Sequence, residues 1–182
     1  DMLAQAEHDT MAAAILLTTD SALARQVVAE VERQLEHHPR RTMTEKAIAH
    51  YGLVVVVDSL EAAAQLSNEF AHEHLELEVD EPWELLEHIR HAGAIFLGCS
   101  TPEAVGDYLA GPNHTLPTSG AARYASALGV EVFMKHSSLI EYSPQALQKV
   151  ANAVNILATA EGLPSHADSV RLRTKNQGDG DF

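Results

Sequence analysis

Residues 53–59 read Leu-Val-Val-Val-Val-Asp-Ser, and this stretch decides the predicted fold. Its apolar part is a β-branched run without polar alternation, which is typical of a strand covered on both faces. Asp58 and Ser59 follow, and both have side chains that cap helix N-termini. The stretch therefore predicts a buried strand that leads directly into a helix ending at Phe70.

Strands and helices alternate on both sides of this unit. Further strands are predicted over residues 12–18, 74–79 and 94–98. Further helices are predicted over residues 2–8, 22–36, 44–50, 81–91 and 100–111, with Asp20 and Asp80 as caps. This repeated alternation predicts an α/β fold, with a parallel, Rossmann-like sheet and right-handed crossovers.

A proline- and glycine-rich stretch over residues 112–129 interrupts the alternation. It is too long for an ordinary connector and is expected to be a functional or wrapping loop. Helices are predicted again over residues 143–161 and 164–174. We therefore predict an α/β domain over residues 1–128 and a helical C-terminal arm over residues 129–182. The end of that arm, residues 176–182, is predicted to be a frayed tail.

The composition argues against several classes of partner. The 182 residues include 12 Lys and Arg against 26 Asp and Glu, which gives a formal charge of −14. Nucleic acids and anionic membranes are bound by basic surfaces, so neither is expected as a partner. No apolar window approaches the roughly 18 residues of a membrane span. The single cysteine, Cys99, fits a reducing cytoplasm, and the eleven histidines direct attention to metal or proton-transfer chemistry.

Four groups of polar residues are candidates for such chemistry: Gln5 with His8, residues 72–74, Asp107 with His114, and Glu161 with His166. Gln5 and His8 are three residues apart and share one helix face. Residues 72–74 read His-Glu-His where a helix gives way to a strand, at a loop end where sites of α/β proteins usually lie.

Each group also has a plainer interpretation that spacing alone leaves open. Gln5 and His8 could lie on a solvated helix face, and residues 72–74 could form an exposed turn. Asp107 could be a helix-face carboxylate, and His114 a loop residue fixed by backbone hydrogen bonds. His166 could be a helix cap. The remaining histidines outside these groups are interpreted as solvated: His37, His38, His50, His88, His91 and His136. No dense zinc signature is present. The residues alone predict an α/β domain with a candidate His/Asp metal site assembled from distant segments.

Five stretches together resemble one family, histidinol dehydrogenase. They occur in its order and at close to its spacing: residues 5–8 (QAEH), 73–75 (EHL), 106–108 (GDY), 111–118 (GPNHTLPT) and 161–166 (EGLPSH). The resemblance runs from residue 1 to about residue 174. It implies that the chain corresponds to the C-terminal part of that enzyme, with an incomplete sheet and more than half of the family's chain upstream. One departure is Ser119, where family members often carry glycine.

The resemblance implies a role for each candidate residue. A catalytic zinc ion would be held by Gln5, His8, Asp107 and His166. The acid/base pair would be Glu73 and His74. The substrate would be bound by Gln5, His8, His74, Asp107, His114, Glu161 and His166.

The implied reaction is the NAD-linked oxidation of L-histidinol through L-histidinal to L-histidine, the end of histidine biosynthesis. His74 would deprotonate the alcohol and later the hydrated aldehyde, while Glu73 would activate the water. Zinc would orient the substrate, and NAD would take the hydride. The chain has no Gly-x-Gly-x-x-Gly sequence, so its cofactor-binding residues are unknown and are expected upstream.

The resemblance also implies a cytoplasmic homodimer in which the C-terminal arm wraps the partner subunit. Taken alone, the chain is expected to be inactive. An alternative is a non-catalytic fragment that binds zinc and dimerises but lacks the NAD site. A further alternative, an unrelated α/β metal-binding or regulatory protein, would require the ordered stretches to be coincidental.

Overall fold

The strand that decides the predicted fold forms as β2 (Gly52–Val56) in the computed structural model, which describes residues 1–175. β2 pairs in parallel with β1 (Ala14–Thr18). A second parallel pair joins β3 (His72–Leu77) to β4 (Ala92–Leu97). The predicted α/β class and parallel strand direction are therefore confirmed. The predicted tail over residues 176–182 lies outside the described residues.

The strands form two two-stranded sheets, with the orders β1-β2 and β3-β4, where the alternation suggested one sheet. Local periodicity locates each strand to within about two residues, since β3 and β4 are predicted over 74–79 and 94–98, but it carries no information about which strands become neighbours. The expectation that β2 is covered on both faces is wrong, because Leu53 is 42% exposed and Val56 is 49% exposed. Helices α2 (Ser21–Leu35) and α3 (Arg41–Tyr51) contact this strand, and their cover leaves those two side chains in solvent.

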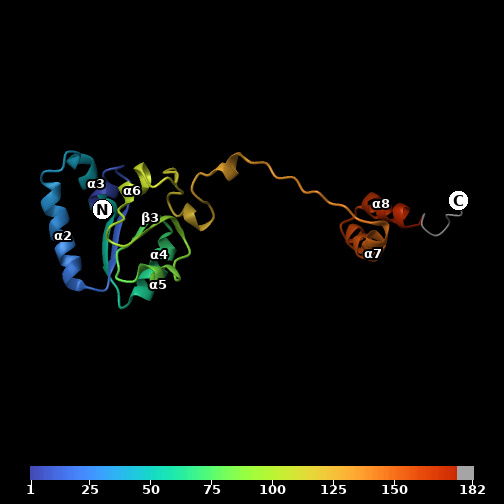
Figure 1. The fold of residues 1–182 in the computed structure, drawn as a ribbon, viewed down its shortest axis with the longest axis horizontal. Helices are drawn as coiled ribbons and strands as arrows, with labels where there is room; N and C mark the ends of the chain where they lie inside the picture. The colour runs from blue at the N-terminus through green and yellow to red at the C-terminus, as the bar shows by residue number, and fades with distance from the viewer. Residues whose placement is uncertain (176–182) are drawn as a thin grey trace. The chain divides into compact units, whose positions relative to one another are not determined.

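Side-chain caps start the long helices where the sequence predicts them. The Asp20 carboxylate accepts a hydrogen bond from the Ala22 N–H at the start of α2. Ser59 caps α4 (Leu60–Phe70) by accepting from the Ala62 N–H. These bonds satisfy backbone donors that have no partner within the helix. Figure 1 shows α2 and α3 on one side of β3 and α4.

Helix α5 (Pro82–Leu86) ends before its predicted end. Its N-cap is Glu81, so the prediction of Asp80 as the cap is wrong. Beyond this end, the Asn68 side chain donates to the carbonyl of His88 at 2.8 Å and accepts from the Arg90 N–H at 2.7 Å. The N–H groups of residues 87–89 bond to carbonyls three residues back, so the α-helical pairing gives way to tighter turns before the chain reaches Asn68.

Helix α6 (Glu103–Tyr108) packs on the β3-β4 pair through a glycine. A Cβ atom at Gly106 would lie 2.5 Å from Cε1 of Phe96, a buried residue of β4. At the start of α6, the Glu103 N–H donates to the Glu76 carboxylate at 2.8 Å. Glu76 and Phe96 are register partners and therefore face the same side of the sheet. The helix is thus fixed at two points to one face.

The loop after α6 contains two short 3₁₀ helices, η1 (Ala121–Arg123) and η2 (Val130–Phe133). Pro117 is buried and lies over Gly93 of β4, where an added Cβ would be 3.1 Å from Cδ of Pro117. Ser119 has a φ of 53°, a left-handed conformation that glycine adopts with less strain. This conformation explains why glycine suits the position of Ser119.

The contacts divide the chain into two units, Asp1–Met134 and Lys135–Phe182. The predicted boundary after residue 128 stays a prediction. The second unit contains α7 (Pro144–Ala160) and α8 (Pro164–Lys175). The two helices are joined by a turn at Gly162 and pack against each other. No helix within residues 1–175 has both the length and the apolar character needed to cross a membrane.

Replacing Gly106 by Ala tests the packing of α6. In an unobstructed helix, this change stabilises the folded protein by about 0.5–1 kcal/mol. At Gly106 the new methyl group would overlap the Phe96 ring, so we expect the free energy of unfolding in urea to fall by about 1–3 kcal/mol. Adding Phe96→Leu should restore part of that loss, because the ring is removed. A more stable Gly106→Ala single variant would contradict the packing described.

Candidate functional site

His74 is the centre of a polar cluster in the first unit. Its side chain is only 8% exposed. The ring nitrogen Nδ1 lies 3.2 Å from Oε1 of Gln5 and 3.7 Å from Oε1 of Glu103. The other nitrogen, Nε2, lies 3.7 Å from Oδ1 of Asp107. The ring is also tilted against Phe96, with centroids 6.0 Å apart.

Strand β3 supplies a rigid position for this histidine. The sequence predicted that this strand begins at His74, but β3 already begins at His72. His74 is therefore held by the ladder, in register with Ala94. Burial lowers the pKa of His72, which packs on Phe70 with ring centroids 5.3 Å apart. His72 is thus predominantly neutral near pH 7.

Helix α1 (Met2–Ala6) brings Gln5 to the cluster, and His8 follows in the turn after it. The prediction that the helix runs to His8 is therefore wrong. Ala6 is fully buried and packs in a small apolar core with alanines of β1 and α3. Gln5 consequently reaches His74, and Nε2 of His8 lies 3.7 Å from Oε1 of Glu103. The His8 side chain is 52% exposed, so the cluster opens to solvent on that side.

Helix α6 brings Asp107 and Glu103 to the same place. The two residues are four apart and lie one helical turn from each other on one face. Glu103 is 8% exposed and was not among the residues selected from the sequence. The one available signal was its spacing to Asp107 and Gly106, which becomes informative only when the helix is placed on β3.

Two predicted residues of the first unit lie apart from this cluster. Glu73 is the strand neighbour of His74, and successive side chains of a strand point to opposite faces. Among residues 1–175, its carboxylate has no hydrogen bond or ion pair. His114 lies exposed in the loop after α6. Glu161 and His166 are exposed residues of the second unit, which is described by itself.

His38 was interpreted as solvated, and the structure corrects this. Its side chain is 15% exposed, and Nε2 lies 3.5 Å from Oε2 of Glu7. Its Nδ1 accepts a hydrogen bond from the Arg40 N–H at 3.2 Å and lies 3.4 Å from the hydroxyl of the buried Thr44. His38 therefore ties the start of α3 to the end of α1, next to His8.

The cluster has the donor set that a zinc ion prefers. Ligand atoms of His74, Glu103 and Asp107 all lie within 4.8 Å of one another. Nε2 of His74 is buried and has no hydrogen-bond partner in the described part of the chain. Imidazole nitrogen and carboxylate oxygen are both common zinc ligands. The residues present therefore fit a divalent metal of this kind, and this group shares Asp107 alone with the ligand set that the resemblance implies.

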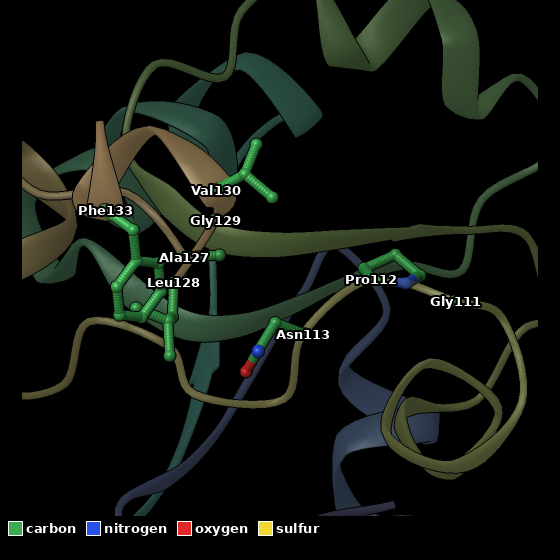
Figure 2. Close-up of a pocket in the computed structure, with 8 residues that line it drawn as sticks. All are labelled: Gly111, Pro112, Asn113, Ala127, Leu128, Gly129, Val130 and Phe133. Atoms are coloured by element: carbon green, nitrogen blue, oxygen red, sulfur yellow. The ribbon is translucent and has the colours of Figure 1, made fainter. Parts of the chain in front are cut away.

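A separate hollow of about 510 Å³ lies between the stretch starting at Gly111 and the loop that leads into η2. Figure 2 shows Pro112 and Asn113 on one side and Val130 and Phe133 on the other. None of its lining residues carries a charged side chain. The hollow therefore offers no charged side chain to the pyrophosphate of a dinucleotide.

Comparison with known proteins gives one consistent result. The sequence model described as histidinol dehydrogenase matches residues 1–174. Histidinol dehydrogenase 2 of Trichormus variabilis is 78% identical over 173 residues, which cover 95% of this chain and 40% of that protein. Histidinol dehydrogenase of a Synechococcus species is 73% identical over 176 residues, covering 97% and 41%.

A solved structure agrees with the sequence relatives. The crystal structure of histidinol dehydrogenase from Elizabethkingia anophelis matches with a TM-score of 0.88 and 35% identity, covering 98% of this chain and 41% of that one. The chain thus spans about 40% of the length of the curated relatives it matches. The match over residues 1–174 places this chain in the histidinol dehydrogenase family.

Proposed function

We propose that the chain forms the zinc- and substrate-binding part of an enzyme that oxidises L-histidinol through L-histidinal to L-histidine. The observation that carries this proposal is the convergence of Gln5 and Asp107 on the buried His74, with His8 at the edge of the same cluster beside Glu103. The family's relatives are named for this activity. NAD is proposed from the resemblance alone, and no residue of this chain is assigned to it.

The proposed zinc ligands are Gln5, His8, Asp107 and His166, of which the first unit contributes three. When bound, zinc supplies a template that orients the imidazole and the amine of the substrate. Glu161, His166 and His114 enter the proposed substrate site from the resemblance. The lone Cys99 is exposed and fits the proposed cytoplasmic location.

His74 is proposed to remove the hydroxyl proton of the alcohol, and later that of the hydrated aldehyde. Its Nε2 is buried and has no hydrogen-bond partner among the described residues, so it is a free acceptor for the hydroxyl of a substrate that enters the cluster. The surrounding protein leaves the His74 side chain 8% exposed, which limits competition from bulk water. Glu73 is proposed from the resemblance alone to activate the water that adds to the aldehyde, a different proton transfer. Its strand position directs its side chain to the face opposite His74, so the geometry of the cluster does not itself support this role.

The second unit is proposed to join two copies of the protein. Leu139 is 99% exposed and Ile140 is 76% exposed, in a segment without helix or strand. Burial of such side chains against a second copy is favourable, at about 25 cal/mol per Å² of apolar area. This exposure also favours the second candidate function, a fragment that binds zinc and dimerises without turnover.

Activity tests need the segments of the relatives that this chain does not match. A suitable protein is a full-length Synechococcus histidinol dehydrogenase in which residues 1–174 of this chain replace the matching segment. We name this protein the chimera. The 73% identity makes the exchange conservative.

Asp107→Asn in the chimera tests the zinc site. The amide removes a charged ligand, so zinc affinity should fall by at least about 100-fold, the upper range for residues that only orient a ligand. Asp80→Asn, at an exposed position, is the matched control and should bind zinc normally. Metal content after dialysis measures the result. Full zinc occupancy in Asp107→Asn would remove this residue from the ligand set.

His74→Asn and Glu73→Gln test the division of labour between the two bases. His74→Asn should slow both oxidations, by about 10²- to 10⁴-fold. Glu73→Gln should slow mainly the aldehyde step, because Glu73 is outside the cluster around His74 and its replacement leaves that cluster intact. Rapid-mixing measurement of NADH formation separates the two steps. Equal loss of alcohol oxidation in both variants would refute the assigned roles.

A further inference from the structure

We propose that Glu103 is a positioning residue for His74. Its carboxylate holds the ring proton on Nδ1 and so leaves Nε2 as the proton acceptor. This inference rests on the proposed function, in which His74 is the base. It adds to that site a carboxylate that no sequence stretch indicated.

The burial of Glu103 is the first observation behind this role. The residue is 8% exposed, and a carboxylate in such a place is costly unless it has partners. Its Oε1 lies 3.7 Å from Nδ1 of His74 and 3.7 Å from Nε2 of His8. The carboxylate thus faces two imidazoles, and the more buried of them is His74.

The second observation is how firmly Glu103 is held. Its own N–H donates to the Glu76 carboxylate at 2.8 Å. Glu76 is two residues from His74 on β3, so both side chains project from the same face. Gly106 lets the helix lie directly on Phe96 of the neighbouring strand. The carboxylate and the ring it orients are therefore fixed to one sheet.

The environment of the ring indicates its tautomer. Nδ1 faces two oxygen acceptors, Oε1 of Gln5 at 3.2 Å and Oε1 of Glu103 at 3.7 Å. A ring nitrogen that faces acceptors carries the hydrogen, and the other nitrogen then keeps its lone pair. That other nitrogen, Nε2, has no hydrogen-bond partner in the described chain. The acceptor it faces is Oδ1 of Asp107 at 3.7 Å, and Asp107, like Gln5, is a proposed zinc ligand.

Glu103 matters most when the metal is bound. Gln5 is a proposed zinc ligand, and an amide oxygen committed to an ion is a poorer acceptor for His74. Glu103 is then the acceptor that remains for the Nδ1 proton. Carboxylates that orient histidines in this way are common beside metal sites, and their loss costs about 10- to 100-fold in activity or metal affinity.

Glu103→Gln in the zinc-loaded chimera tests the proposal. Glutamine keeps the size and removes the charge, so kcat for histidinol oxidation should fall about 10- to 100-fold, with KM and zinc content unchanged. Glu103→Asp, which keeps the charge, should retain more activity than Glu103→Gln. A merely structural role predicts the reverse order, because glutamine fills the space better. Glu84→Gln, at an exposed position, is the control.

A readout independent of turnover is the ¹⁵N shift of the His74 ring, assigned by comparison with His74→Asn. We expect Nδ1–H in the zinc-loaded parent and a shift toward Nε2–H in Glu103→Gln. An unchanged tautomer, an unchanged kcat or a loss of zinc in Glu103→Gln would overturn the proposal; in the last case Glu103 would be a ligand. A parent chimera that does not oxidise histidinol would refute the proposed function, and the tautomer comparison would still decide the role of Glu103.

Discussion

The close approach of α6 to the β3-β4 pair is the constraint on which the candidate site depends. It requires that residue 106 have no side chain, because a Cβ there would lie 2.5 Å from the Phe96 ring. Only at this separation do Glu103 and Asp107, one helical turn apart, both come within 3.7 Å of His74. A helix held further out would leave the histidine facing water, which interacts with both of its nitrogens alike.

Much of the fold could be predicted because it is encoded locally. The β-branched run of β2 and the caps Asp20 and Ser59 depend on residues within a few positions of one another. The predictions that were wrong concern features set by residues far apart in the sequence. Residues 88–90, predicted as helix, are held instead by Asn68, which lies 20 residues before the carbonyl it binds. The exposure of Leu53 and Val56 depends on which elements cover the strand, and a local sequence pattern does not indicate which elements those are.

The candidate site shows the same division. Gln5, His8, His74 and Asp107 could be named from ordered sequence stretches, and the structure gathers all four. Glu103 could not be named, because a glutamate in a first helical turn is ordinarily a solvated residue that favours the helix dipole. Its significance comes from burial beside His74 and from the bond between its N–H and Glu76. Such contacts exist only after strand and helix have packed.

The hydrogen bond between Gln5 and His74 joins residues 69 positions apart. Closing a loop of that length costs chain entropy, which grows with the logarithm of its size, before any contact in the cluster is gained. Contacts of this separation are slow to form during folding. The cluster is therefore expected to assemble late, after the local helices and the strand pairs have formed. A chain caught midway would have most of its secondary structure but no organised site, so metal capture would report completed folding.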